Sequence, residues 1–593
     1  MISNSTGVAV NAKNPILKLT PTGQPIVECP DGLTIALPDV PWGRWYARTH
    51  FSHMSGTPEG LTWYAKHDPL KLEHISLLRS TLRSYQVLAV NRMIMGNCCL
   101  FLPMGVGKSF ISIAFAMWMF QRGLGNVFLV VCPPSVFVTW EDEIELHTTD
   151  YNICVAHGAK KEKALAALRA HPITKPTFVL TSYETLEHIR EKLQSLPICS
   201  VFFDESSKIK NIEAQRTQSA HKLINSLNNT RRFCLSGTPS TKTPLGLFSQ
   251  YEILGKGFSG HPSFLSFENR YAVTKTFATV RLPHGKITSL EADADSMNYW
   301  LSEHRPPNSS ASYLSLGYKF EFKPTKPHDI RVLNYHKRNV KFVNQDELHA
   351  TTQRMAYTVE KTDVLPDLPA KTRVRRSIEL SDEQRKAYND ILNTCRTELE
   401  NTTFSFESNS PYAKLHQIAN GYLIGADHVP VFFKTQPKLH ELRQIIEEAG
   451  DQKIVCWAPF RPLIANTAAF LKSEGISCVE LHGGISPDKR RDVVHEFQNP
   501  GGAQILLANP AVGGLGLNLV SSCLEVFIAN WFSPDVRIQA EDRLWRSGQT
   551  KPVTVVDLVT KGTLEARVLR IALNEVKAEQ RLIAMSVLMG KEA

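Results

Sequence analysis

Two short segments, far apart in the chain, carry residues whose types and spacing suit phosphate chemistry. The first is Gly105-Val-Gly-Lys-Ser109, which follows an apolar segment and precedes a helical pattern. Its glycines allow backbone N–H groups to surround phosphate oxygens, Lys108 adds a positive charge, and the Ser109 hydroxyl can bind Mg²⁺. The second contains Arg543 and Arg546, three residues apart and expected on one helical face. Together they predict that a nucleoside triphosphate lies between two lobes and that its cleavage changes their separation.

Two carboxylates at the end of an apolar run supply the other half of this chemistry. Val201-Phe-Phe-Asp204-Glu205 is predicted to be a strand that ends at the sheet edge where open α/β folds bind ligands. Asp204 is expected to hold Mg²⁺ together with Ser109, and Glu205 to polarise the attacking water. An isolated Asp-Glu pair would indicate a solvated strand end, and the loop has Leu102 where its pattern begins with glycine. Because loop and carboxylates occur together, we favour the catalytic interpretation.

Length and composition indicate a multidomain protein of a reducing compartment. At 593 residues the chain is too long for one core, and three or four domains are expected. The net charge of +10 favours a polyanionic partner, although a basic balance also serves solubility. The eleven cysteines include no C-x-x-C pair, which argues against zinc and against a disulfide framework.

Nothing in the sequence has the length or pattern of a membrane or secretion segment. The apolar runs are far short of a membrane span, and the first residues lack the basic start and apolar stretch of a secretion signal. We therefore expect a soluble protein without membrane contact. The expected compartment is the cytoplasm of a bacterial or phage-infected cell, or the nucleus if the protein is eukaryotic.

Two regions alternate short apolar runs with helical patterns, which predicts an α/β fold with two parallel sheets, each covered by helices on both faces. The expected strands are 127–132, 178–181, 201–203 and 233–235 in the first region and 454–457, 478–481, 505–508, 526–529 and 553–558 in the second. Helices are expected at 110–121, 462–474 and 488–498, and the Pro-free segment 563–589 is expected to form one long helix.

The same patterns divide the chain into consecutive parts. Residues 1–74 are expected to form an N-terminal accessory region, 75–257 the first lobe, and 258–375 an extension of that lobe with an insertion at 283–330. Residues 376–432 are expected to form a helical entry to the second lobe, 433–562 that lobe, and 563–593 a C-terminal brace helix. The Pro- and Ser-rich insertion has the composition of a surface loop or small subdomain.

In their order, these motifs and several others resemble the Swi/Snf-type branch of the superfamily-two helicases, over roughly residues 80 to 575. The segments that carry the resemblance are Leu82-Arg-Ser-Tyr-Gln86, Met104–Ser109, Cys132–Trp140, Leu180–Tyr183, Val201–Glu205, Ser207–Asn211, Leu365–Lys371, Glu379–Gln384 with Tyr388, Leu481–Gly484, Gly513–Asn518 and Gln539–Gln549. Members of this family are ATP-driven DNA translocases. The resemblance implies two RecA-like lobes, helical protrusions and a C-terminal helix.

The resemblance also implies roles for individual residues. The implied nucleotide-binding residues are Gln86 as adenine reader, Gly105, Gly107, Lys108, Ser109 and Gly516. The implied catalytic residues are Lys108, Asp204, Glu205, Gln539, Arg543 and Arg546, with the two arginines on the γ-phosphate. Cys132–Trp140 is expected to touch the DNA backbone. The implied cofactors are ATP and Mg²⁺, the implied partner of a monomer is double-stranded DNA, and single-stranded DNA is a further candidate.

Three positions depart from the family pattern. Ser207 stands where histidine is usual, Thr358-Val359 where a basic pair is usual, and Asn530 where an acid is usual. Two alternatives to a translocase stay open, and Ser207, which bears on the relay from nucleotide to DNA, gives weight to the second of them. One is a strand-separating DNA or RNA helicase, and the other is an ATP-gated nucleic-acid clamp. The compact build indicates a bacterial or phage protein.

Overall fold

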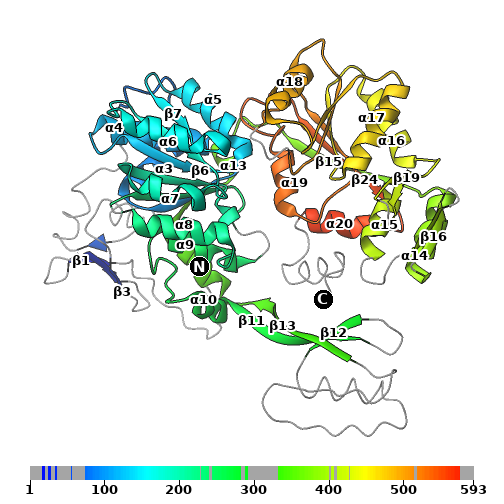
Figure 1. Ribbon diagram of the computed structural model, residues 1–593, viewed down its shortest axis with the longest axis horizontal. Helices are drawn as coiled ribbons and strands as arrows, with labels where there is room; N and C mark the ends of the chain where they lie inside the picture. Colours follow the sequence, from blue (N-terminus) through cyan, green and yellow to red (C-terminus); the bar gives the residue numbers. More distant parts are fainter. Residues whose placement is uncertain are drawn as a thin grey trace, which may run out of the picture.

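The computed structural model describes residues 74–573, apart from 228, 240–242, 282–286, 292–330, 395, 400–401, 406–410, 426–427 and 513–516, together with four short strands nearer the N-terminus. Figure 1 shows two lobes side by side, with an antiparallel arm leaving the first lobe. The short strands β1 (Ile16–Leu19), β2 (Pro25–Glu28), β3 (Thr34–Ala36) and β4 (Ser55–Gly56) form a sheet in the order β3-β2-β1-β4. The rest of the expected N-terminal region lies outside the described residues.

The first lobe is built on a seven-stranded parallel sheet in the order β14-β5-β10-β9-β6-β8-β7. Its strands are β5 (Cys98–Phe101), β6 (Val127–Val131), β7 (Asn152–Val155), β8 (Thr177–Thr181), β9 (Ile198–Asp204), β10 (Arg231–Ser236) and β14 (Ala356–Thr358). Within β9, Phe202 joins one buried apolar cluster, whereas Val201 and Phe203 join the other. Burial on both faces explains the continuous apolar runs of these strands.

Helices cover both faces of this sheet. They are α3 (Ser84–Met95), α4 (Lys108–Gln121), α5 (Phe137–His147), α6 (Lys161–Ala170), α7 (Leu186–Gln194), α8 (Gln215–Ser226), α9 (Leu247–Leu254), α10 (Phe264–Tyr271) and α12 (Gln345–Met355). Short 3₁₀ turns lie at η1 (Pro134–Val136), η2 (Gly158–Lys160), η3 (Ser206–Ile209) and η4 (Pro244–Gly246). The phosphate loop lies between β5 and α4, and the two carboxylates end β9, so both are at the same edge of the sheet.

The second lobe has a six-stranded parallel sheet in the order β15-β24-β23-β20-β22-β21. Its strands are β15 (Lys371–Ile378), β20 (Ile454–Trp457), β21 (Cys478–Leu481), β22 (Ile505–Ala508), β23 (Leu524–Phe527) and β24 (Val553–Thr560). Its helices are α16 (Pro437–Ala449), α17 (Arg461–Ser473), α18 (Pro487–Gln498), α19 (Pro534–Glu541) and α20 (Glu565–Ala572). The expected α/β class with two parallel sheets is confirmed.

The chain passes from the first sheet to the second through α13 (Lys361–Val364), which lies between β14 and β15. Strand β15 pairs with β24 along its whole length, so residues 371–375 belong to the second sheet. The expected boundary between the first-lobe extension and the second-lobe entry therefore falls inside this strand. Helices α14 (Asp382–Thr394) and α15 (Pro411–Ala419) follow and share an apolar cluster of their own.

Two hairpins flank these helices, and a longer arm leaves the first lobe. The hairpins pair β16 (Arg396–Leu399) with β17 (Thr402–Ser405) and β18 (Tyr422–Ile424) with β19 (Pro430–Phe432). In the arm, β11 (Ala272–Arg281) pairs antiparallel with β13 (Arg331–Phe342) and with β12 (Ile287–Glu291). Strand β12 lies inside the expected insertion 283–330, and residues 292–330 lie outside the described part.

The expected C-terminal brace helix can be compared with the structure only in part. Helix α20 ends at Ala572, and residues 574–593 of the expected brace helix lie outside the described residues. Across the described part of the chain, no helix combines the length and the apolar character that crossing a membrane requires.

Candidate active site

The loop between β5 and α4 depends on two glycines with left-handed backbone conformations. Gly105 has φ 79° and Gly107 has φ 82°, a region that residues with a Cβ atom rarely adopt. A Cβ atom at Gly107 would lie 2.7 Å from the Gln86 Nε2 atom, and one at Gly105 would lie 2.8 Å from the Arg546 Cβ atom. The loop is therefore pressed between α3 of the same lobe and the arginine segment of the other.

Lys108 begins α4 and folds back over the loop. Its Nζ atom donates hydrogen bonds to the carbonyl oxygens of Leu102, at 3.0 Å, and Pro103, at 3.2 Å. Burial lowers the pKa of Lys108, while the neighbouring carboxylates of Glu205 and Asp204 act in the opposite direction. A phosphate group in the loop would offer this ammonium group stronger acceptors than two neutral carbonyls.

The Asp204 carboxylate at the end of β9 accepts a hydrogen bond at each of its two oxygens. The indole Nε1 of Trp140 donates to Asp204 Oδ2 at 2.8 Å, and the backbone N–H of Glu205 donates to Asp204 Oδ1 at 3.0 Å. Glu205 has φ 51°, a strained conformation for a residue with a side chain and one that concentrates at functional sites. Burial raises the pKa values of both carboxyl groups, and the charge of Asp204 raises that of Glu205 further. A divalent cation beside them would relieve this crowding of negative charge.

The arginine pair reaches the same place from the second lobe. Arg543 and Arg546 line a cleft with residues of the first lobe: Met104, Gly105, Gly107, Lys108, Ser109, Val136, Thr139, Trp140, Glu143, Asp204 and Glu205. Burial, followed by the charge of Arg546, lowers the pKa of Arg543 to about 10. Three cleft atoms, Glu205 Oε2 and the two arginine Nε atoms, are buried without a hydrogen-bond partner among the described residues. Such unpaired groups in a cleft indicate a polar ligand.

The local structure around the arginines differs from the expected helix. Helix α19 ends at Glu541, and tighter turns follow, in which the Arg543 N–H donates to the Ala540 carbonyl and the Arg546 N–H to the Leu544 carbonyl. The expectation that both arginines share a helical face is therefore wrong. Contacts from the chain segment between the lobes hold these turns, and sequence periodicity cannot reveal such contacts.

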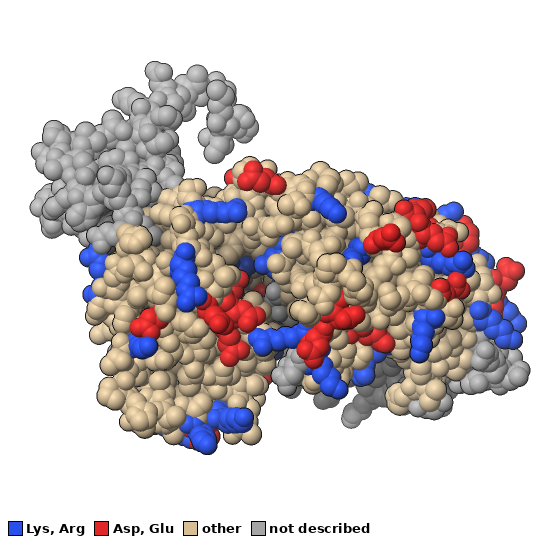
Figure 2. All heavy atoms as spheres, turned by 90° about the horizontal axis from the view of Figure 1, so that it is seen from above, with Lys and Arg blue, Asp and Glu red and all other residues tan. Residues whose placement is uncertain are grey.

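Contacts at the surface also join the two lobes. The Arg491 Nη2 atom of α18 lies 3.2 Å from Asp142 Oδ1 of α5, and the Arg83 Nη2 atom donates to Ser547 Oγ at 3.4 Å. Side chains of both charge signs lie along the hollow between the lobes (Figure 2). The structure is thus that of a closed pair of lobes.

The remaining predicted site residues lie outside the cleft lining. The Gln86 side chain accepts a hydrogen bond from the Arg83 N–H at 2.9 Å and donates to the Val106 carbonyl at 3.2 Å, which places it behind the phosphate loop. Gln539 is half-buried on α19 and is not among the described residues that line the cleft. Gly516 lies outside the described residues. The roles assigned to these three stay predictions.

Sequence reasoning missed the contribution of α5. Trp140 belongs to the segment expected to touch DNA, yet its indole binds Asp204, and Thr139 and Glu143 from the same helix line the cleft. One signal was present, because a tryptophan in an apolar setting needs an acceptor for its N–H. Its partner is distant in sequence, so the pairing depends on the fold of the sheet.

Both lobes match models of known protein families. A family model described as an SNF2-related domain matches residues 83–423, and one described as a helicase conserved C-terminal domain matches residues 437–548. The chain is 26% identical over 490 residues to the TATA-binding protein-associated factor mot1 of Aspergillus fumigatus, covering 75% of this chain and 23% of that protein. It is 23% identical over 503 residues to the ATP-dependent DNA helicase DDM1 of Arabidopsis thaliana, covering 81% and 58%. The chain thus spans less than two thirds of either relative.

Among solved structures, the chain is similar to the Sulfolobus solfataricus SWI2/SNF2 ATPase core in complex with dsDNA. The sequence identity is 20% and the TM-score 0.37, over 88% of this chain and 98% of that one.

Proposed function

Because the chain belongs to the SNF2-related family, we propose that it is a DNA-stimulated ATPase that converts ATP hydrolysis into movement along double-stranded DNA. The observation that carries this proposal is the cleft itself, in which the phosphate loop and carboxylates of one lobe meet the arginine pair of the other. A nucleoside triphosphate there would contact both lobes at once. Its cleavage would remove the group that both lobes share, and this gives a physical reason for the lobes to separate.

Each cleft residue has a defined part in this proposal. Lys108 and the loop N–H groups bind the phosphates, and Arg543 and Arg546 stabilise the charge that develops on the transferred phosphoryl group. Glu205, which lines the cleft next to Asp204, orients the attacking water. Ser109 and Asp204 offer the oxygen ligands that Mg²⁺ prefers, and the cation would neutralise phosphate charge.

We expect double-stranded DNA to be the best activator of ATP hydrolysis, ahead of single-stranded DNA and RNA. DNA contacts in this proposal are mainly with phosphates, so stimulation should fall steeply as salt is added and should not depend on sequence. The measurement is the ATPase rate with each nucleic acid across a salt series, combined with displacement of a triplex-forming strand. Efficient unwinding of forked duplexes, or stronger activation by RNA, would instead favour the helicase alternative.

The clamp alternative rests on Ser207 and on the relay beside it. The Ser206 hydroxyl donates to Gln250 Oε1 at 2.7 Å, and Gln250 Nε2 donates to the Pro239 carbonyl at 3.0 Å. This path links the end of β9 to the turn after β10 without using residue 207. A clamp would hydrolyse ATP but displace no triplex strand, which separates it from a translocase.

Ser207→His is expected to leave basal hydrolysis close to that of the wild type and to raise the DNA-stimulated increment. The half-buried serine lies in η3, next to the relay through Ser206, and does not line the cleft. ATPase rates with and without duplex DNA give both quantities. A fall in basal hydrolysis would place Ser207 in the catalytic shell.

Deleting residues 285–328 and joining the ends with a short Gly/Ser linker should preserve ATP hydrolysis. The paired strands β11 and β13 keep their ladder, and Phe342 and Ala272 at its base are buried in the first-lobe core. Solubility and basal ATPase rate of the deletion variant test this. Loss of soluble protein would show that the insertion is integral to the first lobe.

A further inference from the structure

The segment that joins the two lobes is attached to each of them by a different kind of contact. Leu365 is buried in the first-lobe core, and Val364 and Leu368 pack against the same cluster. On the other side, Lys361 reaches into the second lobe, where its Nζ atom lies 2.6 Å from Asp542 Oδ1 and also donates to the Trp545 carbonyl. The apolar side fixes the segment to the first lobe. The polar side joins it to the turns at residues 542–546, which carry Arg543 and Arg546 and are called the arginine turns below.

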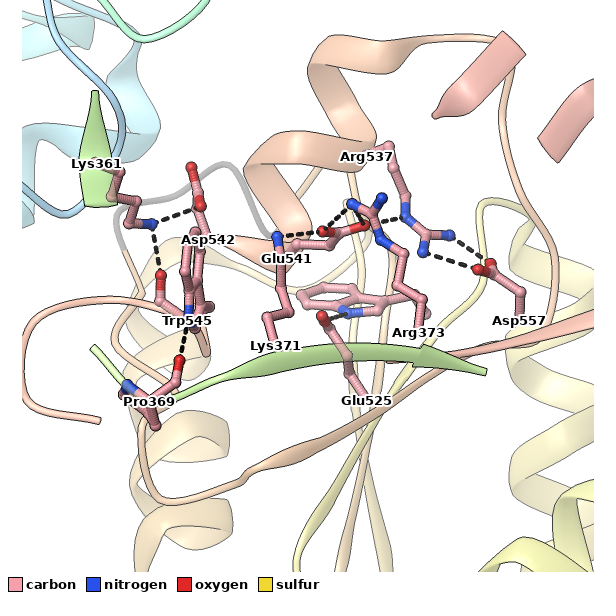
Figure 3. A network of polar contacts seen from close by, with 11 residues as sticks. Lys361, Pro369, Lys371, Arg373, Glu525, Arg537, Glu541, Asp542, Trp545 and Asp557 are labelled. Atoms are coloured by element: carbon pink, nitrogen blue, oxygen red, sulfur yellow. Dashed lines mark hydrogen bonds and ion pairs between the residues drawn. The ribbon is translucent and has the colours of Figure 1, made fainter. Parts of the chain in front are cut away.

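The ion pair between Lys361 and Asp542 is shut off from solvent. Lys361 is 6% exposed and Asp542 7% exposed, so each charge depends on the other for compensation. Figure 3 shows Lys361 entering from the segment between the lobes and pointing at Asp542 and the Trp545 carbonyl. A buried pair of this kind contributes little net stability but strongly prefers one arrangement, because a displaced partner leaves an uncompensated charge.

Trp545 adds a second attachment to the same segment. Its indole Nε1 donates to the Pro369 carbonyl at 2.8 Å, and its ring has the Nζ atoms of Lys361 and Lys371 at 4.7 Å and 4.5 Å from its centre. Both ammonium groups are within the range of cation–π attraction. The arginine turns are therefore held at two residues, Asp542 and Trp545, by residues 361–371.

The preceding residue, Glu541, is fixed within the second lobe itself. Lys371 and Arg373 of β15 and Arg537 of α19 bind its carboxylate, and Arg537 also binds Asp557 of β24 (Figure 3). These ion pairs fix the end of α19 to the second sheet. Beyond it, Asp542 directly precedes Arg543 and Trp545 directly precedes Arg546, so the contacts of Lys361 with these two residues determine how the turns continue from the end of α19.

The first-lobe end of the joining segment leads to the phosphate loop. The Tyr357 hydroxyl on β14 donates to the Tyr85 carbonyl at 3.1 Å, and the Tyr85 hydroxyl donates to the Val106 carbonyl at 2.9 Å. A path of contacts therefore runs from the loop at Val106, through β14 and Lys361, to the arginine turns. It passes beside the cleft and needs no nucleotide to be continuous.

We propose that Lys361 is a positioning residue that aligns Arg543 and Arg546 with the phosphate loop through its contacts with Asp542 and Trp545. The proposal rests on the ATPase function proposed above. Opening the cleft with the segment held to the first lobe separates Lys361 from Asp542, and closure re-forms the buried pair. The arginines then reach the nucleotide only when the segment between the lobes is seated.

The test compares two nucleotide complexes that place different demands on the arginines. ADP reports ground-state binding, whereas ADP with aluminium fluoride mimics the transferred phosphoryl group. Lys361→Met should leave ADP affinity within about twofold and weaken the aluminium fluoride complex by at least about tenfold. It should lower turnover at saturating ATP by about 10–100-fold, as expected for a displacement on the order of 1 Å. In a background with Arg543→Ala and Arg546→Ala, Lys361→Met should have no further effect.

Lys453→Met is the matched control. Lys453 also combines an aromatic ring, that of Phe497 at 5.3 Å, with two backbone acceptors, the Gly502 and Ala503 carbonyls, but all of these lie in the second lobe. Its ratio of affinities for the two complexes should match that of the wild type.

A second variant separates the positioning effect from a folding defect, because Lys361→Met alone leaves Asp542 buried without a counter-charge. Lys361→Met combined with Asp542→Asn removes both charges and should show the same selective loss of the aluminium fluoride complex. An unchanged ratio of affinities in either folded variant would overturn the role of Lys361. Wild-type protein that binds nucleotide without hydrolysing it would contradict the proposed function, and the ratio would still decide the role of Lys361.

Discussion

Arg546→Ala is expected to lower ATP turnover by about 10³–10⁵-fold, or roughly 4–7 kcal/mol of transition-state stabilisation, while ATP still binds. The Arg546 guanidinium lines the cleft opposite Lys108 and Glu205, and its buried Nε atom has no partner among the described residues. Alanine retains the Cβ atom that lies against Gly105, so the packing between lobes is preserved. Turnover at saturating ATP and nucleotide affinity, measured separately, check this result.

The control for this variant is Arg570→Ala, which removes an exposed guanidinium from α20 of the same lobe. Its turnover and affinity should equal those of the wild type. If Arg546→Ala instead loses nucleotide affinity while turnover at saturation persists, Arg546 binds the ground state and does not act on the transition state.

The sequence predicted the centres of both sheets well because those strands are buried on two faces. The expected strands 454–457 and 505–508 coincide with β20 and β22, and both consist of residues that are fully buried. Such strands must be apolar throughout, which leaves a local signal that needs no knowledge of the fold. The four-residue strand β23 was expected at 526–529 but lies at Leu524–Phe527. It begins earlier than expected because it includes the charged residue Glu525.

The edge strand β15 left no comparable signal, unlike β21 at the other edge of the same sheet, which lies at the expected residues 478–481. Strand β15 contains Lys371, Arg373, Arg375 and Arg376, and its apolar content is too low to suggest a strand of a parallel sheet. It pairs with β24 because the chain, on leaving α13, reaches the open edge of the second sheet. Its basic side chains then bind Glu541 and other acids of that lobe. This is tertiary pairing, and periodicity in the sequence does not encode it.

The candidate site shows the same difference between residues that local sequence identifies and residues that only the fold brings together. Residue types and spacing identified Lys108, Asp204, Glu205, Arg543 and Arg546, and the structure brings these five into one cleft, although their roles stay predictions. Sequence reasoning missed the residues that support them, Trp140 beneath Asp204 and Lys361 beside the arginine turns. Groups that touch a ligand follow from the chemistry of that ligand, whereas groups that position them follow from packing.

Lys108→Ala is expected to reduce ATP turnover by at least about 10²–10³-fold, the effect of removing one preorganised donor from a developing negative charge. The variant also leaves the Leu102 and Pro103 carbonyls without the donor they have in this structure, so part of the effect is a less ordered loop. Weaker binding of ATP should therefore accompany the loss of turnover, in contrast to Arg546→Ala. Circular dichroism, nucleotide affinity and DNA-stimulated turnover are the measurements, and Lys160→Ala, at an exposed lysine of the same lobe, is the control. An unaltered DNA-stimulated rate in well-folded Lys108→Ala protein would mean that the loop between β5 and α4 does not hold the nucleotide.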